Sequence, residues 1–138
     1  MFMPKLDHVL EAALYFDDLD AAQHFYEQVL GLKPIFGDQR LHAYAIGNTV
    51  LLLFLRGSSL HTLHLPGGTI PPHDGLGDVH VAFAVGKEEL PAWERHLAEH
   101  NVPIEGRTHW PKGSISIYFR DTGGNLLELA TPGLWANY

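Results

Sequence analysis

The stretch Asp78-Val79-His80-Val81-Ala82-Phe83-Ala84-Val85 decides the fold. Four large apolar side chains occupy its odd positions, while His80 and two alanines occupy even ones. This period-two pattern predicts a strand with one packed face, and it directs His80 to the opposite face. A single histidine in such a place is more often a satisfied structural residue than a ligand, so its role depends on the rest of the chain.

The residues after this strand predict one helix and three more strands. The helix is expected near residues 88–100, with Pro91 in its first turn, where a missing N–H costs little. The strands are expected at 102–106, 114–120 and 125–131.

The first half of the chain predicts the same order of elements. Asp18 is a good N-cap and Gly31 a C-terminal stop for a helix over about 19–30. The expected strands are 6–16, a short edge strand at 33–37, 40–46 and 49–55. Residues 56–77 have no periodicity and predict a long connecting loop.

Shared landmarks in the two halves predict an internal duplication. His8 and His80 lie 72 positions apart, each in the first expected strand of its half, and Pro34 and Pro103 lie 69 apart. We therefore predict an α+β protein made of two tandem βαβββ modules, about residues 5–55 and 78–132, joined by the loop 56–77 into a single domain over 1–138.

Composition narrows the possible partners. A net charge of −7 with scattered basic residues argues against nucleic acid and anionic membranes. The chain has no cysteine, which excludes a disulfide framework and a thiolate metal site. The N-terminal residues lack an apolar signal region, and the longest apolar run, 50–55, is too short to span a bilayer. We expect a soluble, cytoplasmic protein.

The last predicted hairpin places polar residues on one face. A turn over 121–125 sets Tyr118 opposite Glu128 and Ser116 opposite Ala130, because a slip of one residue would pair polar with apolar side chains. The same face takes Ser114 and Lys112. A carboxylate among apolar neighbours is costly unless it is paired or binds a metal.

His8, His80 and Glu128 form a set of two histidines and one carboxylate. Such a set holds Fe, Mn, Ni or Zn and leaves coordination positions open. The competing interpretation is a solvated edge carboxylate with two incidental histidines. The duplication favours the metal site.

Several short motifs are distributed along nearly the whole chain. They are Leu6-Asp7-His8, Asp18-Leu19, Phe25-Tyr26, Leu30-Gly31, Val79-His80-Val81-Ala82-Phe83, Tyr118-Phe119-x-Asp121 and Gly124-Asn125-x-x-Glu128. In order and spacing they resemble the vicinal oxygen chelate superfamily, which includes glyoxalase I, extradiol dioxygenases, fosfomycin-resistance proteins and bleomycin-binding proteins. The resemblance implies a cupped mixed sheet with helices on its outer face, around one divalent metal ion held by His8, His80 and Glu128. It also implies a homodimer in which His8 can serve the partner's site.

The first half lacks a counterpart to Glu128, since every candidate in 50–53 is apolar, so the fourth ligand of glyoxalase I is absent. Three ligands leave room for a chelating small-molecule substrate, and a divalent ion leaves this site with one net positive charge. The resemblance suggests a thiol transferase of the fosfomycin-resistance type, with Lys112, Ser116 and Tyr118 as catalytic residues.

Two other functions remain open: an Fe(II) extradiol-type dioxygenase and a non-catalytic protein that sequesters a small molecule. The acid–base residue of a dioxygenase could be Tyr118 or one of the loop histidines, His61, His64 and His73.

Overall fold

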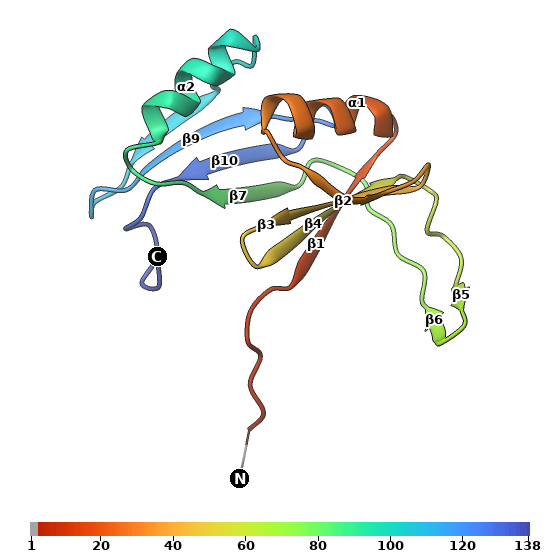
Figure 1. Ribbon diagram of the computed structural model, residues 1–138. Helices are drawn as coiled ribbons and strands as arrows, with labels where there is room; N and C mark the ends of the chain where they lie inside the picture. The colour runs from red at the N-terminus through yellow and green to blue at the C-terminus, as the bar shows by residue number, and fades with distance from the viewer. Residues whose placement is uncertain (1–2) are drawn as a thin grey trace. The chain divides into compact units, whose positions relative to one another are not determined.

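The first half of the chain is a βαβββ module. The computed structural model describes residues 3–138 and divides into two compact units, of which the first ends at Gly75. The module contains β1 (Glu11–Phe16), α1 (Leu19–His24) with its continuation η1 (Phe25–Val29), β2 (Pro34–Gly37), β3 (Leu41–Ile46) and β4 (Thr49–Leu55) (Figure 1). Its sheet has the order β1-β4-β3-β2, in which only β1 and β4 are parallel.

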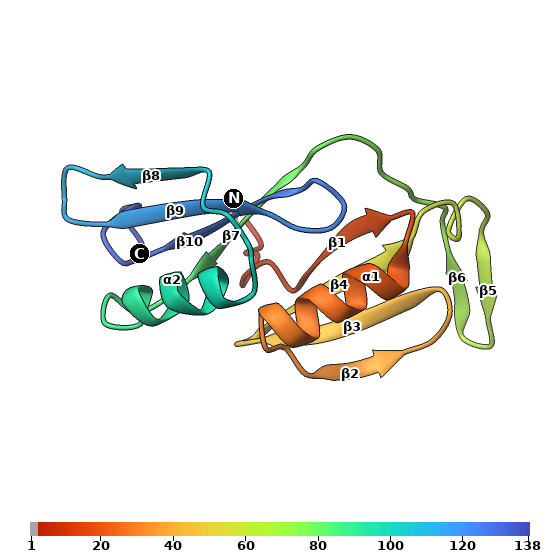
Figure 2. The same ribbon diagram turned by 90° about the horizontal axis from the view of Figure 1, so that it is seen from above.

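The helix of this unit begins and ends where the sequence predicts. Asp18 accepts a hydrogen bond from the backbone N–H of Ala21 at 3.0 Å. The last turn widens into a π-helix, in which the Leu30 N–H donates to the Phe25 carbonyl, and Gly31 then takes a positive φ of 71°. The helix lies over β4 (Figure 2) and buries its apolar face against the sheet.

The second unit, Leu76–Tyr138, repeats the module. It contains β7 (His80–Ala84), α2 (Leu90–Glu99), β8 (Gly106–His109), β9 (Ile115–Arg120) and β10 (Leu126–Ala130). The strand order is β7-β10-β9-β8, again with one parallel pair, β7 and β10. The α+β class and the duplicated βαβββ order are thus confirmed.

The predicted register of the last hairpin is also confirmed. Glu128 pairs with Tyr118 and Ala130 with Ser116. Ile117, Phe119, Leu127 and Leu129 are buried on the other face, as the alternation requires. The described part of the chain contains no helix that is long and apolar enough to cross a membrane.

Three predicted elements differ from the structure. β1 begins at Glu11 rather than at residue 6, because its partner β4 begins only at Thr49 and offers no backbone to pair with residues 3–8. β8 occupies 106–109 rather than 102–106, since the Val102 N–H donates to the Leu97 carbonyl in the turn that ends α2.

The third difference lies in the predicted loop 56–77. It contains a short hairpin of β5 (Leu63–Leu65) and β6 (Gly68–Ile70), joined by Pro66-Gly67. Strands of three residues are too short to show a periodic pattern in the sequence.

Candidate metal centre

Glu128 is a buried carboxylate at the centre of the second sheet. It lies on β10 between Tyr118 of β9 and Ala82 of β7, and 5% of its surface is exposed. Its two oxygens have different neighbours. Oε2 accepts a hydrogen bond from the Ser116 hydroxyl at 2.5 Å, and Oε1 lies 3.1 Å from Nε2 of His80. A buried carboxylate needs such partners, because its desolvation is costly.

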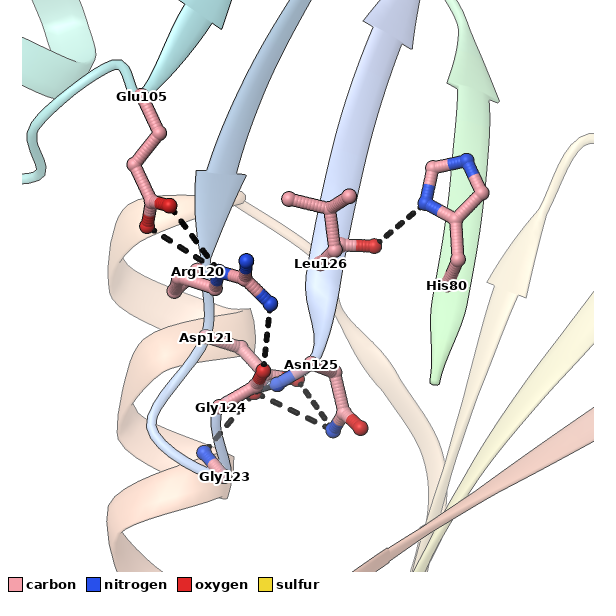
Figure 3. Close-up of polar contacts among 8 residues, drawn as sticks. All are labelled: His80, Glu105, Arg120, Asp121, Gly123, Gly124, Asn125 and Leu126. Atoms are coloured by element: carbon pink, nitrogen blue, oxygen red, sulfur yellow. Dashed lines mark hydrogen bonds and ion pairs between the residues drawn. The ribbon is translucent and has the colours of Figure 1, made fainter. Parts of the chain in front are cut away.

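His80 is the first residue of β7 and is fixed by its other ring nitrogen. Nδ1 lies 2.8 Å from the carbonyl oxygen of Leu126, its cross-strand partner (Figure 3). A carbonyl can only accept, so Nδ1 carries a proton and donates it to this hydrogen bond. Histidines that bind metals are commonly oriented by such a hydrogen bond from the ring nitrogen that does not bind the metal.

The Nε2 of His80 and the Oε1 of Glu128 face each other at 3.1 Å. Such a contact is repulsive unless a proton or a cation lies between the two atoms. Two ligands that bind one metal ion at ~2.1 Å, with angles of about 90–110° between the bonds, are roughly 3.0–3.4 Å apart. The observed 3.1 Å fits that geometry, and an imidazole with a carboxylate suits Zn, Mn, Fe or Ni.

Ser116 and Trp110 form a chain of hydrogen bonds behind the carboxylate. Ser116 is fully buried, and its hydroxyl accepts the indole N–H of Trp110 at 2.9 Å while it donates to Glu128. Ser116 is therefore placed to orient Glu128. Sequence reasoning assigned Trp110 no part in this network, since an indole donor six residues before a serine gives no recognisable pattern.

The other residues predicted for this face have different surroundings in the structure. The Tyr118 ring is half-buried, with its centroid 6.3 Å from that of His80. Lys112 is exposed in the turn before β9, and among residues 3–138 it forms no ion pair. Ser114 is buried and donates to the Thr131 carbonyl at 2.7 Å, which is a structural role.

The turn between β9 and β10 sets the positions of both His80 and Glu128. Oδ1 of Asp121 accepts the backbone N–H groups of Gly123 and Asn125 at 2.9 and 3.0 Å, and the Asn125 amide donates to the same carboxylate (Figure 3). Oδ1 of Asn125 is in turn 3.4 Å from the backbone N of Val79, the residue before His80. This turn thus fixes the start of β10 and the start of β7 together.

His8 lies outside the strands. It is exposed on the segment before β1, and its Nε2 is 3.3 Å from the Asn48 carbonyl oxygen. The predicted placement of His8 in the first strand is therefore wrong, for the reason given for β1. Among the described residues, no three histidine or carboxylate side chains gather into a cluster that could hold a metal ion.

The strand ladders identify Glu11 as the repeat counterpart of His80. Glu11 is the first residue of β1 and lies opposite Val50 of the parallel strand β4, just as His80 begins β7 opposite Leu126. These two residues are 69 positions apart, the same spacing as Pro34 and Pro103.

A spacing of 72 would align the exposed Glu11 with Phe83 and reverse the two faces of the strand. The ladders also show what stands in place of Glu128 in the first unit. Leu52 lies opposite Ala13, two residues beyond Glu11, as Glu128 lies opposite Ala82, two residues beyond His80. The counterpart of Glu128 in the first unit is therefore an apolar side chain, Leu52.

A family model described as the Glyoxalase/Bleomycin resistance protein/Dioxygenase superfamily matches residues 5–129. Among curated proteins, the metallothiol transferase FosB of Bacillus licheniformis is 30% identical over 119 residues, which cover 86% of this chain and 71% of the relative. The protein of the same name from Staphylococcus saprophyticus is 28% identical over 118 residues, covering 85% and 72%.

Solved structures share the fold. The lactoylglutathione lyase of Agrobacterium tumefaciens has a TM-score of 0.87 and 34% identity, with 96% of this chain and 99% of that chain covered. The fosfomycin resistance protein FosX of Listeria monocytogenes has a TM-score of 0.66 at 19% identity, with 96% and 97% covered, a likeness of fold alone.

Proposed function

This chain belongs to the Glyoxalase/Bleomycin resistance protein/Dioxygenase superfamily, and we propose that it is a divalent-metal-dependent enzyme that chelates and activates a small oxygen-rich substrate. The observation that carries this proposal is the close approach of two potential metal ligands, His80 Nε2 and Glu128 Oε1, at 3.1 Å. A bound divalent ion would act as a Lewis acid on adjacent substrate oxygens. Ser116 would hold the second carboxylate oxygen, and the Leu126 carbonyl would hold the imidazole.

The third ligand would come from the first half of the same chain or of a second copy, in a homodimer. Two residues are candidates for this third ligand. The family resemblance indicates His8, whereas the alignment of the two modules indicates Glu11. We favour Glu11, because it shares with His80 both the first position of a strand and the face of the sheet. With Glu11, two carboxylates would neutralise a divalent ion, whereas His8 would leave one net positive charge.

Two reactions are supported by the relatives. Thiol transfer is supported by the relatives named metallothiol transferase, at about 30% identity, and by Leu52 in place of a fourth carboxylate. A lyase reaction on a thioester such as lactoylglutathione is supported by the lyase of 34% identity. We propose thiol transfer first, with Tyr118 and Lys112 as residues that could contact the substrate, and the lyase reaction second.

Metal analysis of protein purified without chelators tests the metal centre. The wild type should carry close to one divalent ion per chain, and Glu128→Ala should lose it. Glu105→Ala is the matched control, because Glu105 is an exposed carboxylate on the same unit that pairs with Arg120. An unchanged metal content in Glu128→Ala would remove the basis of the proposal.

The identity of the metal and two assays separate the reactions. Manganese would favour thiol transfer, zinc or nickel the lyase reaction, and iron a dioxygenase. Consumption of fosfomycin together with a thiol would support the transferase, and turnover of lactoylglutathione would support the lyase. A protein with neither activity and no metal would point to a sequestering function.

A further inference from the structure

The first unit contains a cavity of about 610 Å³ on the face of its sheet that α1 does not cover. Leu14 and Phe16 are buried toward the helix, so the alternate residues Ala13 and Tyr15 line the cavity. Each lies directly opposite an apolar partner on β4, Ala13 opposite Leu52 and Tyr15 opposite Phe54. The volume falls within the range of small-molecule sites.

Three rings, those of Tyr15, Phe54 and His73, lie together in one wall of this cavity. The Tyr15 and Phe54 rings stack with centroids 5.8 Å apart and planes inclined by 22°. The His73 ring meets Phe54 edge-on at 4.8 Å. The Tyr15 hydroxyl and Nδ1 of His73 are hydrogen-bonded at 2.6 Å, and burial raises the pKa of Tyr15, so this hydroxyl stays protonated. The Tyr15 hydroxyl therefore adds no charge to this wall.

Arg40 adds a cation at the same place. Its guanidinium carbon lies 5.4 Å from the centroid of the Phe54 ring, and Nη1 donates to the Ser59 hydroxyl at 3.0 Å. Within residues 3–138, Arg40 forms no ion pair. The nearby Asp38 uses Oδ1 to accept the backbone N–H groups of Arg40 and Leu41 instead. The remaining N–H groups of the Arg40 guanidinium can therefore donate hydrogen bonds to an anionic ligand.

Ser58 supplies a second, independent sign of a ligand. Its hydroxyl oxygen is buried and has no hydrogen-bond partner among the described residues, yet it lines this cavity. Buried polar atoms are normally satisfied, because leaving one unpaired is costly.

We propose that this cavity binds a small, flat, apolar molecule with one anionic group. The apolar part packs on the Tyr15 and Phe54 rings, and the anionic group accepts hydrogen bonds from Arg40 and Ser58. Glu11 also lines the cavity, and its carboxylate repels an anion. The anionic group is therefore expected beside Arg40. That this molecule is also the substrate of the metal centre rests on the proposed function, through Glu11. The binding itself does not need the metal.

Calorimetric titration of metal-free protein with two isosteric probes tests the proposal. The probes are 2-naphthoate and its neutral analogue 2-naphthamide. The ligand efficiency of small molecules predicts a dissociation constant of about 1 mM for naphthoate. Arg40→Gln should weaken naphthoate binding about tenfold and leave naphthamide binding nearly unchanged. Arg95→Gln, an exposed arginine on α2, is the control with the same charge change and should alter neither.

Two further variants locate the bound probe. Ala13→Leu should abolish binding of both probes by placing a larger side chain beside the rings, and His80→Ala should leave probe binding intact. Amide chemical shifts provide a check that does not depend on whether Ala13→Leu folds. Shift changes on adding naphthoate should concentrate at Ala13, Tyr15, Leu52, Phe54 and Ser58.

Failure of the wild type to bind naphthoate, an equal effect of Arg40→Gln and Arg95→Gln, or shift changes confined to the second unit would each overturn the proposal. A wild type that binds naphthoate but carries no metal when purified without chelators would count only against the metal centre. The two proposals can therefore fail separately.

Discussion

Glu11 and His80 occupy the same position in two copies of one structural module. Each is the first residue of a strand that pairs in parallel with the last strand of its unit. One copy presents a carboxylate there and the other an imidazole, and both residue types bind divalent metals.

The third-ligand assignment predicts different effects for two neighbouring substitutions. Glu11→Gln should lower metal affinity at least tenfold, because an amide replaces a charged ligand, whereas His8→Gln should leave it unchanged. Competition with a chromogenic chelator measures both. The opposite ranking would restore His8 as the ligand, and no effect of either variant would leave the site with only His80 and Glu128.

Ser116→Ala should affect both folding and metal affinity. The substitution leaves Oε2 of Glu128 buried without its donor, so the free energy of unfolding should fall by ~1–3 kcal/mol. Metal affinity should fall about 10- to 100-fold, because the carboxylate loses its orienting partner.

Ser114→Ala is the matched control for this prediction. Ser114 is also fully buried, but it donates to the Thr131 carbonyl, so the control should lose stability and keep its metal affinity. Equal loss of affinity in both variants would mean that Ser116 acts only through packing. Urea unfolding and chelator competition give the two readouts.

Asp38 should stabilise the protein in a pH-dependent way. Hydrogen bonds from the backbone N–H groups of Leu41 and Arg40 hold the pKa of Asp38 below its ordinary value of 3.8. A lowered folded-state pKa adds stability above the unfolded value, and this stability is lost as the pH falls through the folded value. Asp38→Ala should therefore cost about 1 kcal/mol at pH 7, a small effect because the side chain is exposed, and less at about pH 2.5.

Asp38→Asn keeps an acceptor oxygen and should cost less than Asp38→Ala at pH 7. Unfolding in urea at the two pH values measures these differences. A cost of Asp38→Ala that is the same at both pH values would contradict the assignment.

Tyr44 should make the protein less stable in alkali. The side chain is fully buried and donates to Oε2 of Glu27 at 2.8 Å, and burial followed by this hydrogen bond raises the pKa of Tyr44. Above pH ~10 the unfolded chain loses a proton that the folded chain keeps, so the free energy of unfolding falls as the pH rises.

Tyr44→Phe should cost about 1–3 kcal/mol at pH 7, because it leaves Glu27 without this donor, and it should flatten the alkaline decline. Chemical denaturation at pH 7 and at about pH 11 tests both effects. A decline of unchanged slope in the variant would assign the alkaline loss to other groups.

The sequence predicts the elements whose patterns are local. The alternation of polar and apolar residues around the turn at 121–125 yields the pairing of Tyr118 with Glu128, since any slip would bury polar groups. Asp18 and Gly31 mark the two ends of the first helix through local effects, the Asp18 carboxylate by accepting a backbone N–H and Gly31 by its positive φ. The hairpin at 63–70 is missed because its strands are too short to be periodic.

The repeat partner of His80 is identified by the face of the sheet that a residue occupies in its strand, and not by its residue type. Matching histidine with histidine gives a spacing of 72, which exchanges the two faces of the strand, and only the ladder with β4 reveals the spacing of 69. The Trp110 to Ser116 contact is likewise invisible in sequence, because it depends on how β8 and β9 meet.

The hydrogen bond from Ser116 also bears on which ion the proposed metal centre would select. With Oε2 engaged by a hydroxyl, Glu128 can offer a metal ion a single oxygen, Oε1. Calcium takes six to eight oxygen ligands, from carboxylates that bind through one or both oxygens. In the proposed metal centre, an imidazole beside a carboxylate that offers one oxygen would suit a transition ion better than calcium.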